Sequence, residues 1–348
     1  MIAELMKPIL FRALYGSWGV TDGKPHGSGY SALLPVPADL PVFLQIALKS
    51  LMTQDQEHLA EVLVLPDIPS QEFRAVFEKL TEGISSSRIR LIEMSGKDMT
   101  VARLYKTPNV YYFLQILNGI RNARSTHVLL HDADLFLFSR DFLRRHYEEC
   151  LQRCVSVLGV DRRSITRLEE CRHIVATWEM IATVEWAMRF KPHEHRGHRR
   201  LFRGRLMNFD STLLPQFLTD PREIGINEEF GEDDYVHFNF VISVYRLFRK
   251  FRGRFEDEHF KLLLIRSLID ALGDAGWTYS VPSMTELVNA LDGKDDRVSY
   301  IESRTRKGYE IFRRNLERLR QSGILGAEAG DILKRQLIPF DERFVWMP

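Results

Sequence analysis

Two aspartates stand two positions apart directly after a hydrophobic run. The run Val128–Leu130 leads through His131 into Asp132 and Asp134, and four further apolar residues follow. On an extended segment, carboxylates at i and i+2 point in the same direction. Mg²⁺ and Mn²⁺ prefer oxygen ligands and are typically held by one or two carboxylates together with substrate phosphates. The motif therefore predicts a cation that clamps a diphosphate, and the alternative interpretation is a solvated acidic turn.

A second acidic group, Glu232-Asp233-Asp234, precedes a mixed apolar and basic run. A carboxylate in this position is a candidate general base for an acceptor hydroxyl. The alternative is that the acids complement the dipole of a following helix. Trp178 and Glu179 are candidates for facing an acceptor, because aromatic rings stack on sugars, and the alternative for Trp178 is a place in the core.

The elements that must position these residues alternate along the first part of the chain. Strands are expected at 30–36, 61–67, 88–94 and 126–138, and helices at 41–54, 70–83 and 109–125. Apolar strands that alternate with amphipathic helices indicate a parallel sheet covered on both faces. Ligands of such sheets bind at the carboxyl ends of the strands, which here carry Pro35, Asp67 and the Asp132/Asp134 pair.

The second half of the chain is less regular. Residues 173–187 fit either a strand or a helix, and helices are expected at 236–251, 260–276 and 309–323. The first 29 residues carry five glycines and are expected to be irregular. We expect three parts: the lead-in 1–29, a catalytic domain 30–248 with halves 30–138 and 139–248, and a helical region 249–348.

Composition excludes several classes of protein. The chain has 348 residues, of which 45% are hydrophobic, and its 48 Lys+Arg nearly balance 47 Asp+Glu. A net charge of +1 argues against a general nucleic-acid binder. No apolar run approaches the roughly 20 residues of a transmembrane helix, and the first residues do not fit a signal peptide. Three cysteines, Cys150, Cys154 and Cys171, lack metal-binding spacing. These features predict a cytoplasmic protein, with peripheral attachment to the inner face of the membrane as an alternative.

Four motifs in order resemble the GT-A glycosyltransferases, in particular the large inverting, family 2-like group. The opening YSALLPVPADLPVFLQIALKSLMTQ (30–54) and the strand EVLVLPD (61–67) are similar to that family's first strand, helix and second strand. The Asn-Gly pair at Asn118 ahead of the Asp-x-Asp strand, the segment MNFDSTLLP (207–215) and GEDDY (231–235) complete the resemblance. It covers about 30–245 and implies an α/β GT-A fold, a Rossmann-like mixed sheet flanked by helices, with a C-terminal helical extension.

The resemblance also implies a role for each matching residue. Pro35, Asp67 and Asn118 would line the nucleotide-sugar site. Asp132 would bind ribose or metal, and Asp134 would be the main ligand of Mn²⁺ or Mg²⁺. Asp233, or its neighbour Asp234, would deprotonate the acceptor hydroxyl, and Asp210 would lie beside the acceptor pocket. The family often adds a late histidine to the metal, for which His237 and His259 are candidates and His259 is preferred.

The expected function is therefore metal-dependent transfer of a sugar from a nucleotide diphosphate, UDP or GDP first, to a hydroxyl acceptor with inversion. Alternatives are a retaining transferase, a sugar nucleotidyltransferase and a non-catalytic binding module. The second strand ends in Pro66-Asp67-Ile68-Pro69 where the family often has two acids followed by Gly-Ser, so the base is not specified. The acceptor is also unspecified, and a homo-oligomer remains open.

Overall fold

The computed structural model describes residues 2–19, 27–82, 84, 88–162, 173–202, 204–273 and 277–344. Cys171 and part of the glycine-rich lead-in lie outside these ranges. Contacts divide the chain into two compact units. The first comprises Met1–Ala38, Gln54–Ala133 and Arg140–Gly231, and the second Asp39–Thr53, Asp134–Ser139 and Glu232–Pro348. The chain thus passes between the units inside the Asp-x-Asp motif, a division that the sequence did not predict.

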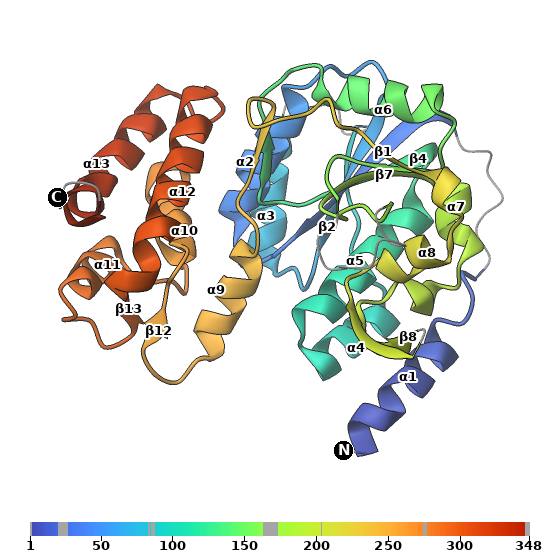
Figure 1. Ribbon diagram of the computed structural model, residues 1–348, viewed down its shortest axis with the longest axis horizontal. Helices are drawn as coiled ribbons and strands as arrows, with labels where there is room; N and C mark the ends of the chain where they lie inside the picture. The colour runs from blue at the N-terminus through green and yellow to red at the C-terminus, as the bar shows by residue number, and fades with distance from the viewer. Residues whose placement is uncertain are drawn as a thin grey trace. The chain divides into compact units, whose positions relative to one another are not determined.

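A seven-stranded mixed sheet forms the first unit (Figure 1). Its strand order is β10-β6-β7-β4-β1-β2-β3. The bounds are β1 (Gly27–Val36), β2 (Leu59–Pro66), β3 (Ile89–Leu91), β4 (Ser125–His131), β6 (Val157–Gly159), β7 (Glu179–Thr183) and β10 (Ile224–Ile226). β1 pairs in parallel with β2 and β4, whereas β7 runs antiparallel to β4 and β6. The α/β prediction is confirmed, and the sheet is mixed rather than wholly parallel.

The helices of the first unit lie before, between and after these strands in the chain. They are α1 (Ile2–Leu14), α3 (Gln71–Thr81), α4 (Gly96–Tyr105), α5 (Pro108–Asn122), α6 (Phe142–Gln152), α7 (Val184–Arg189) and α8 (Leu213–Leu218), with 3-10 turns η2 (Pro192–His195) and η3 (Pro221–Glu223) and a hairpin of β8 (His198–Phe202) and β9 (Arg205–Phe209). Ser70 caps α3 by accepting a hydrogen bond from the Phe73 amide.

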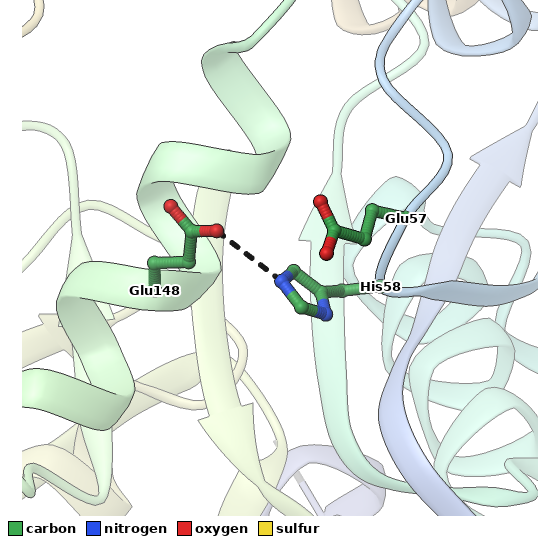
Figure 2. Close-up of side chains that lie close together, drawn as sticks. All are labelled: Glu57, His58 and Glu148. Atoms are coloured by element: carbon green, nitrogen blue, oxygen red, sulfur yellow. Dashed lines mark hydrogen bonds and ion pairs between the residues drawn. The ribbon is translucent and has the colours of Figure 1, made fainter.

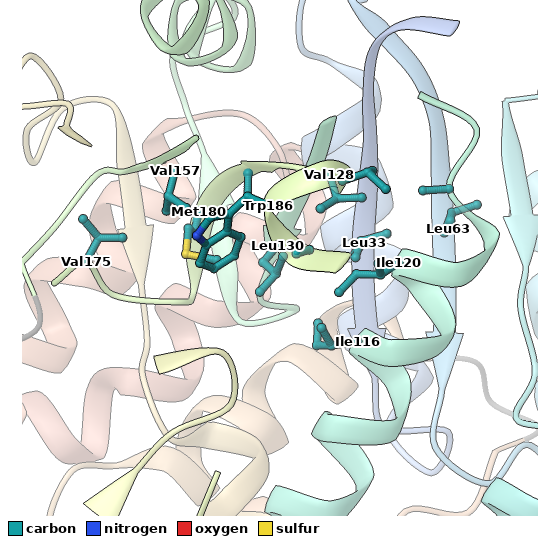
Figure 3. Close-up of a cluster of buried hydrophobic side chains, with 14 of the residues drawn as sticks. Leu33, Leu63, Ile116, Ile120, Val128, Leu130, Val157, Val175, Met180 and Trp186 are labelled. Carbon is teal, nitrogen blue, oxygen red and sulfur yellow. The ribbon is translucent and has the colours of Figure 1, made fainter. Parts of the chain in front are cut away.

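The main core lies between α5 and the sheet (Figure 3). Ile116 and Ile120 of α5 pack with Leu33 of β1, Leu63 of β2 and Leu130 of β4. At Gly119, a Cβ atom would lie 2.9 Å from side-chain atoms of Leu33 and Leu65, so glycine lets the helix approach the sheet closely. This packing fixes α5 over the strands whose ends carry the candidate site.

The prediction of an irregular lead-in is wrong for α1. Phe11 and Tyr15, four residues apart, are buried in a cluster with residues of α4 and α5. The Tyr15 hydroxyl also donates a hydrogen bond of 2.8 Å to buried Asp98. Side-chain burial against distant helices stabilises α1, and the glycines that dominate the sequence pattern begin only after Tyr15.

The second unit joins helices to two short strand pairs. Its helices are α2 (Pro41–Met52), α9 (Val241–Lys250), α10 (Lys261–Leu272), α11 (Met284–Leu291), α12 (Glu302–Gln321) and α13 (Ala327–Phe344), and its strands are β5 (Leu135–Leu137), β11 (Tyr235–His237), β12 (Phe255–Glu256) and β13 (Val298–Ser299). β5 pairs antiparallel with β11, which shortens the helix expected at 236–251 to α9. Phe260 contacts the rings of Tyr300, Tyr309 and Phe344 in the core of this unit.

Within the described ranges, no helix has both the length and the apolarity that a bilayer crossing requires.

Cys150 is a buried free thiol on α6, and Cys154 is an exposed one. Cys154 lies beyond the end of α6 with φ of 50°, so the two cysteines do not share a helix face.

Candidate functional site

Three predicted residues meet at one edge of the sheet in the first unit. β1 lies between β2 and β4 and is parallel to both, so the carboxyl ends of these three strands face the same way. Pro35 is the next-to-last residue of β1, Asp67 follows β2, and Asp132 follows β4. The chain adds β2 and β3 on one side of β1 and β4 on the other. Such a reversal of strand order opens a crevice at the carboxyl edge, where α/β sheets bind ligands.

Asp67 ties the loops after β1 and β2 together. Its Oδ1 accepts hydrogen bonds from the amides of Ala38 (2.9 Å) and Ile68 (2.8 Å), and its own amide donates to the Val36 carbonyl. The side chain is buried. A charged oxygen that accepts two backbone hydrogen bonds fixes the backbone around it, so Asp67 shapes the loop expected to line the nucleobase pocket.

Helix α5 reaches the same edge with two amide side chains. Gln115, which the sequence analysis missed, is buried and donates from Nε2 to the carbonyls of Val36 and Leu65 at the ends of β1 and β2. Asn118 is buried one turn later, and its Nδ2 has no hydrogen-bond partner among the described residues. A buried donor without a protein partner is available to a ligand or water. This placement agrees with the expected part of Asn118 in a nucleotide-sugar site.

Asp132 is held by a tyrosine that the sequence analysis also missed. The Tyr112 hydroxyl, on α5, donates to Asp132 Oδ1 at 3.0 Å, and the Asp132 amide donates to the Trp178 carbonyl at 3.0 Å. Asp132 is half-buried. Tyr112 thus orients the carboxylate, and the hydrogen bond to Trp178 fixes the backbone of Asp132.

The residues expected near the acceptor lie in or against the core of the first unit. Trp178 is buried, which favours the alternative interpretation as a core residue. Glu179 on β7 is fully buried, and its Oε2 accepts a 2.7 Å hydrogen bond from Nδ1 of His131, which lies directly opposite on β4. A buried ion pair or hydrogen bond between strands explains Glu179 without an acceptor. Asp210 is half-buried after β9, where the backbone of Asp210 and Ser211 packs closely on Gly197.

In the second unit, Asp134 and His237 form a buried pair. The Oδ1 atom of Asp134 lies 3.3 Å from His237 Nε2, and the side chains of His237 and Asp134 are only 6% and 5% exposed. Oδ2 accepts a hydrogen bond from the Val241 amide at the start of α9, and the Asp134 carbonyl accepts one from Phe238. The antiparallel pairing of His237 with Leu135 brings the imidazole to the carboxylate.

Charge keeps the Asp134 carboxylate ionised. Burial alone would raise the pKa of Asp134, but the hydrogen bond and charge of His237, with the nearby ammonium of Lys261, bring this pKa below its ordinary value. A buried, ionised carboxylate beside an imidazole is a donor set that suits a cation such as Mn²⁺. The residues of this pair therefore fit the expected metal.

The structure favours His237, not His259, as the histidine partner of Asp134. His259 is exposed and its ring lies beside Gly308 of α12. The preference for His259 rested on sequence distance alone. The pairing of β5 with β11 brings His237 next to Asp134. The sequence pattern predicts a helix at 236–251, and so it did not indicate this pairing.

The two candidate bases differ in their surroundings. Asp234 Oδ1 accepts a hydrogen bond from the Ser139 hydroxyl, and its carbonyl accepts one from the Phe138 amide. Asp233 is exposed, and no described side chain pairs with it. Asp234 thus anchors the turn before β11, while the Asp233 carboxylate is accessible for proton transfer.

A second group with metal-type ligands lies on the first unit (Figure 2). The ligand atoms of Glu57, His58 and Glu148 lie within 4.8 Å of one another, and His58 Nε2 is 3.3 Å from Glu148 Oε1. Arg144 donates a 2.9 Å hydrogen bond to the other oxygen of Glu148 and also pairs with Asp55. Arg144 and His58 thus link these carboxylates into a surface ion-pair network, and we interpret the group in this way.

Comparisons with known proteins return structures but no sequence relatives. No family model and no curated protein matches the chain. Among solved structures, it is similar to the mannosyltransferase PcManGT from Pyrobaculum calidifontis in complex with GDP-Man and Mn²⁺ (12% identity, 96% of this chain and 83% of that chain, TM-score 0.39). It is also similar to S. aureus TarS 1-349 (12% identity, 90% and 91%, TM-score 0.40).

A further similarity is to the galactosyltransferase LgtC in complex with donor and acceptor sugar analogs (15% identity, TM-score 0.37). That match covers 47% of this chain and 62% of LgtC, so the chain spans less than two thirds of LgtC. At these identities and TM-scores the neighbours assign neither a family nor an activity. The chain has an α/β fold whose central mixed sheet is flanked by helices.

Proposed function

We propose that this chain is a GT-A-like glycosyltransferase that moves a sugar from a nucleotide diphosphate to an acceptor hydroxyl. The observation that carries the proposal is the position of Asp67 and Asp132 at strand ends on either side of β1, where the strand order reverses. Nucleotides bind at such a point in α/β sheets. The motif order that resembles GT-A enzymes, from 30–54 to GEDDY at 231–235, supports the same reading.

In this proposal the donor nucleotide binds at the edge formed by β1, β2 and β4. The loop after Pro35 and the Asp67 carboxylate would contact the base, and the free Nδ2 donor of Asn118 would bind the ribose or a phosphate. Tyr112 would hold the Asp132 carboxylate in place. The donor is a UDP- or GDP-sugar in the first instance, because the residues at this edge do not by themselves distinguish the bases.

Asp134 and His237 of the second unit would hold a divalent cation, Mn²⁺ or Mg²⁺. Asp132, two residues before Asp134, would bind ribose or metal, as the resemblance implies. When bound, the cation would neutralise negative charge on the leaving diphosphate. The Asp134 carboxylate and the neutral imidazole of His237 would supply the ligand atoms.

Asp233 would accept the proton of the acceptor hydroxyl as that oxygen attacks the anomeric carbon. Its exposure and lack of a described partner support this role over Asp234, which is engaged with Ser139. One base on the acceptor side is sufficient for a single displacement with inversion, and no protein nucleophile is needed. The acceptor class is open.

We propose the cytoplasm as the compartment, which the free thiols Cys150 and Cys154 support.

The test is the release of UDP or GDP from a panel of UDP- and GDP-sugars with Mn²⁺, comparing Asp233→Asn with Asp234→Asn. A positioned general base typically contributes about 10²–10⁴-fold to a rate, so Asp233→Asn is expected to lose at least 100-fold in kcat while the KM for the donor is retained. Asp234→Asn is expected to lose far less. Turnover of no donor by the wild-type chain would reject the transferase, and equal losses in both variants would reject Asp233 as the base.

A further inference from the structure

Strand β11 carries the candidate metal ligand His237 and begins two residues after the candidate base Asp233. Its backbone pairs on one side with β5, from Tyr235 to His237, and the two strands form a sheet of their own. A two-stranded pair is at best marginally stable by itself. The positions of His237 and Asp233 therefore depend on contacts from outside this pair of strands.

Two cations from helices α10 and α12 bond to the backbone at the two ends of β11. Arg318 on α12 donates from Nη2 to the Tyr235 carbonyl at 2.6 Å, and its guanidinium lies 5.7 Å from the centre of the Phe138 ring. Lys261, the first residue of α10, donates from Nζ to the carbonyl of Phe238, which directly follows β11. All of these residues belong to the second unit. One cationic donor thus holds each end of the strand.

The backbone that follows β11 adopts a conformation that needs support from its surroundings. Asn239 and Phe240 have φ of 43° and 62°. This left-handed region is unfavourable for residues other than glycine and persists where neighbouring contacts hold it. The Phe238 amide donates to the Asp134 carbonyl at 3.0 Å, and the Phe238 carbonyl accepts the bond from Lys261. The lysine therefore helps to hold the loop that lies against Asp134.

The charge of Lys261 and its hydrogen bond have opposite consequences for a metal site. Its ammonium is close enough to the buried carboxylates of Asp134 and Asp257 to act on the charge of both. The Asp257 side chain also accepts the Lys261 amide at 2.8 Å, which fixes the start of α10. A cation beside Asp134 repels a divalent cation, so charge alone predicts that removal of Lys261 strengthens metal binding. Loss of the hydrogen bond to the backbone predicts weaker metal binding, because β11 would no longer be held in place.

We propose that Lys261 and Arg318 are positioning residues that hold β11 so that His237 lies beside Asp134. The inference rests on the proposed function, in which Asp134 and His237 bind a divalent cation. Groups that hold metal ligands in place typically contribute about 10–100-fold to metal affinity. Helices α10 and α12 would thereby order one ligand of the metal and the segment that carries the base.

The first measurement is a titration of the full chain with Mn²⁺ alone, followed by the electron paramagnetic resonance signal of the free ion. Lys261→Met and Arg318→Met are each expected to raise the Kd for Mn²⁺ by about 10–100-fold. Lys261→Arg and Arg318→Lys keep a cationic donor and are expected to bind Mn²⁺ more tightly than the corresponding methionine variants. Arg254→Met is the matched control, because Arg254 donates from Nε to the Val298 carbonyl on β13, which pairs with β12. The control is expected to bind Mn²⁺ as the wild type does.

The second measurement is amide hydrogen exchange of residues 235–241 without metal, followed by mass spectrometry. Exchange is expected to be faster in Lys261→Met and Arg318→Met than in the wild type and in Arg254→Met, because the ends of β11 are released. Circular dichroism establishes that each variant is folded. The two cations lie on different helices, so if one methionine variant does not fold, the other still tests the proposal.

The two measurements separate failure of this proposal from failure of the proposed function. Unchanged or tighter Mn²⁺ binding in the folded methionine variants would overturn the positioning role, and so would exchange no faster than in the control. A wild type that binds no Mn²⁺ would instead reject the metal site itself, and the exchange rates would still decide whether Lys261 and Arg318 hold β11.

Discussion

Replacing Asp67 should loosen the edge of the sheet where we place the donor nucleotide. The Asp67 carboxylate accepts two backbone hydrogen bonds, from Ala38 and Ile68, and is buried. A hydrogen bond to a charged group contributes about 1.5–3 kcal/mol to the free energy of unfolding. We take the lower value for each of the two bonds because water can reach the loops, so Asp67→Ala is expected to lower the free energy of unfolding by about 3 kcal/mol. Asp67→Asn keeps an acceptor oxygen and should lose about half as much, since neutral hydrogen bonds are roughly half as strong.

Thermal unfolding followed by circular dichroism measures this difference. A domain of about 150–250 residues loses about 2–4 °C in Tm for each kcal/mol, so Asp67→Ala should lower Tm by about 6–12 °C and Asp67→Asn by about 3–6 °C. Asp220→Ala is the control, because Asp220 forms an exposed pair within its own turn with Arg222. Such pairs contribute about 0–1 kcal/mol. A shift for Asp67→Ala no larger than that of Asp220→Ala would refute the structural role of Asp67.

Two further predictions concern the core of the first unit. Burial lowers the pKa of His146 to about 3, so the unfolded chain binds a proton that the folded chain excludes between about pH 6.5 and pH 3. Protonation of His146 in the unfolded chain therefore costs nothing above about pH 6.5 and lowers the free energy of unfolding by about 1.4 kcal/mol per pH unit below it. In His146→Leu, the free energy of unfolding measured with urea should depend less on pH over this range. An unchanged pH dependence would contradict this. Gly119→Ala would place a Cβ atom 2.9 Å from side-chain atoms of Leu33 and Leu65 and should lower the free energy of unfolding by about 1–3 kcal/mol in the same assay. An unchanged free energy of unfolding would show that α5 can move away from the sheet.

The periodic part of the fold could be predicted from the sequence. Apolar runs at 30–36, 61–67 and 126–138 correspond to β1, β2 and the β4–β5 region, because buried parallel strands leave a strong local signal. The residues at the strand ends, Asp67 and Asp132, were identified for the same reason. Antiparallel β7 and its pairing with β4 left no such signal, since residues 173–187 mix strand and helix patterns.

Long-range pairing accounts for what the sequence did not predict. His237 lies beside Asp134 because β11 pairs with β5, a contact between segments about a hundred residues apart. Gln115 and Tyr112 were missed because their roles depend on how α5 lies over the sheet, and amphipathic spacing reveals only its buried face. Glu179 was assigned to an acceptor when its partner is His131 on the neighbouring strand. Helix α1 was missed because Phe11 and Tyr15 gain their stability from α4 and α5.

The central claim is metal-dependent binding of a nucleotide diphosphate, with Asp134 and His237 as metal ligands and Asp132 bound to ribose or metal. The most direct measurement is thermal unfolding with UDP, GDP, CDP, dTDP or CMP, each with and without Mn²⁺. A ligand at about 100 times its Kd adds about 2.7 kcal/mol of stability. We expect one nucleoside diphosphate to stabilise the wild type only with Mn²⁺, and Asp132→Asn and His237→Gln to lose that response while His259→Gln keeps it. No metal-dependent stabilisation by any of these nucleotides, with the wild-type chain folded, would contradict the account.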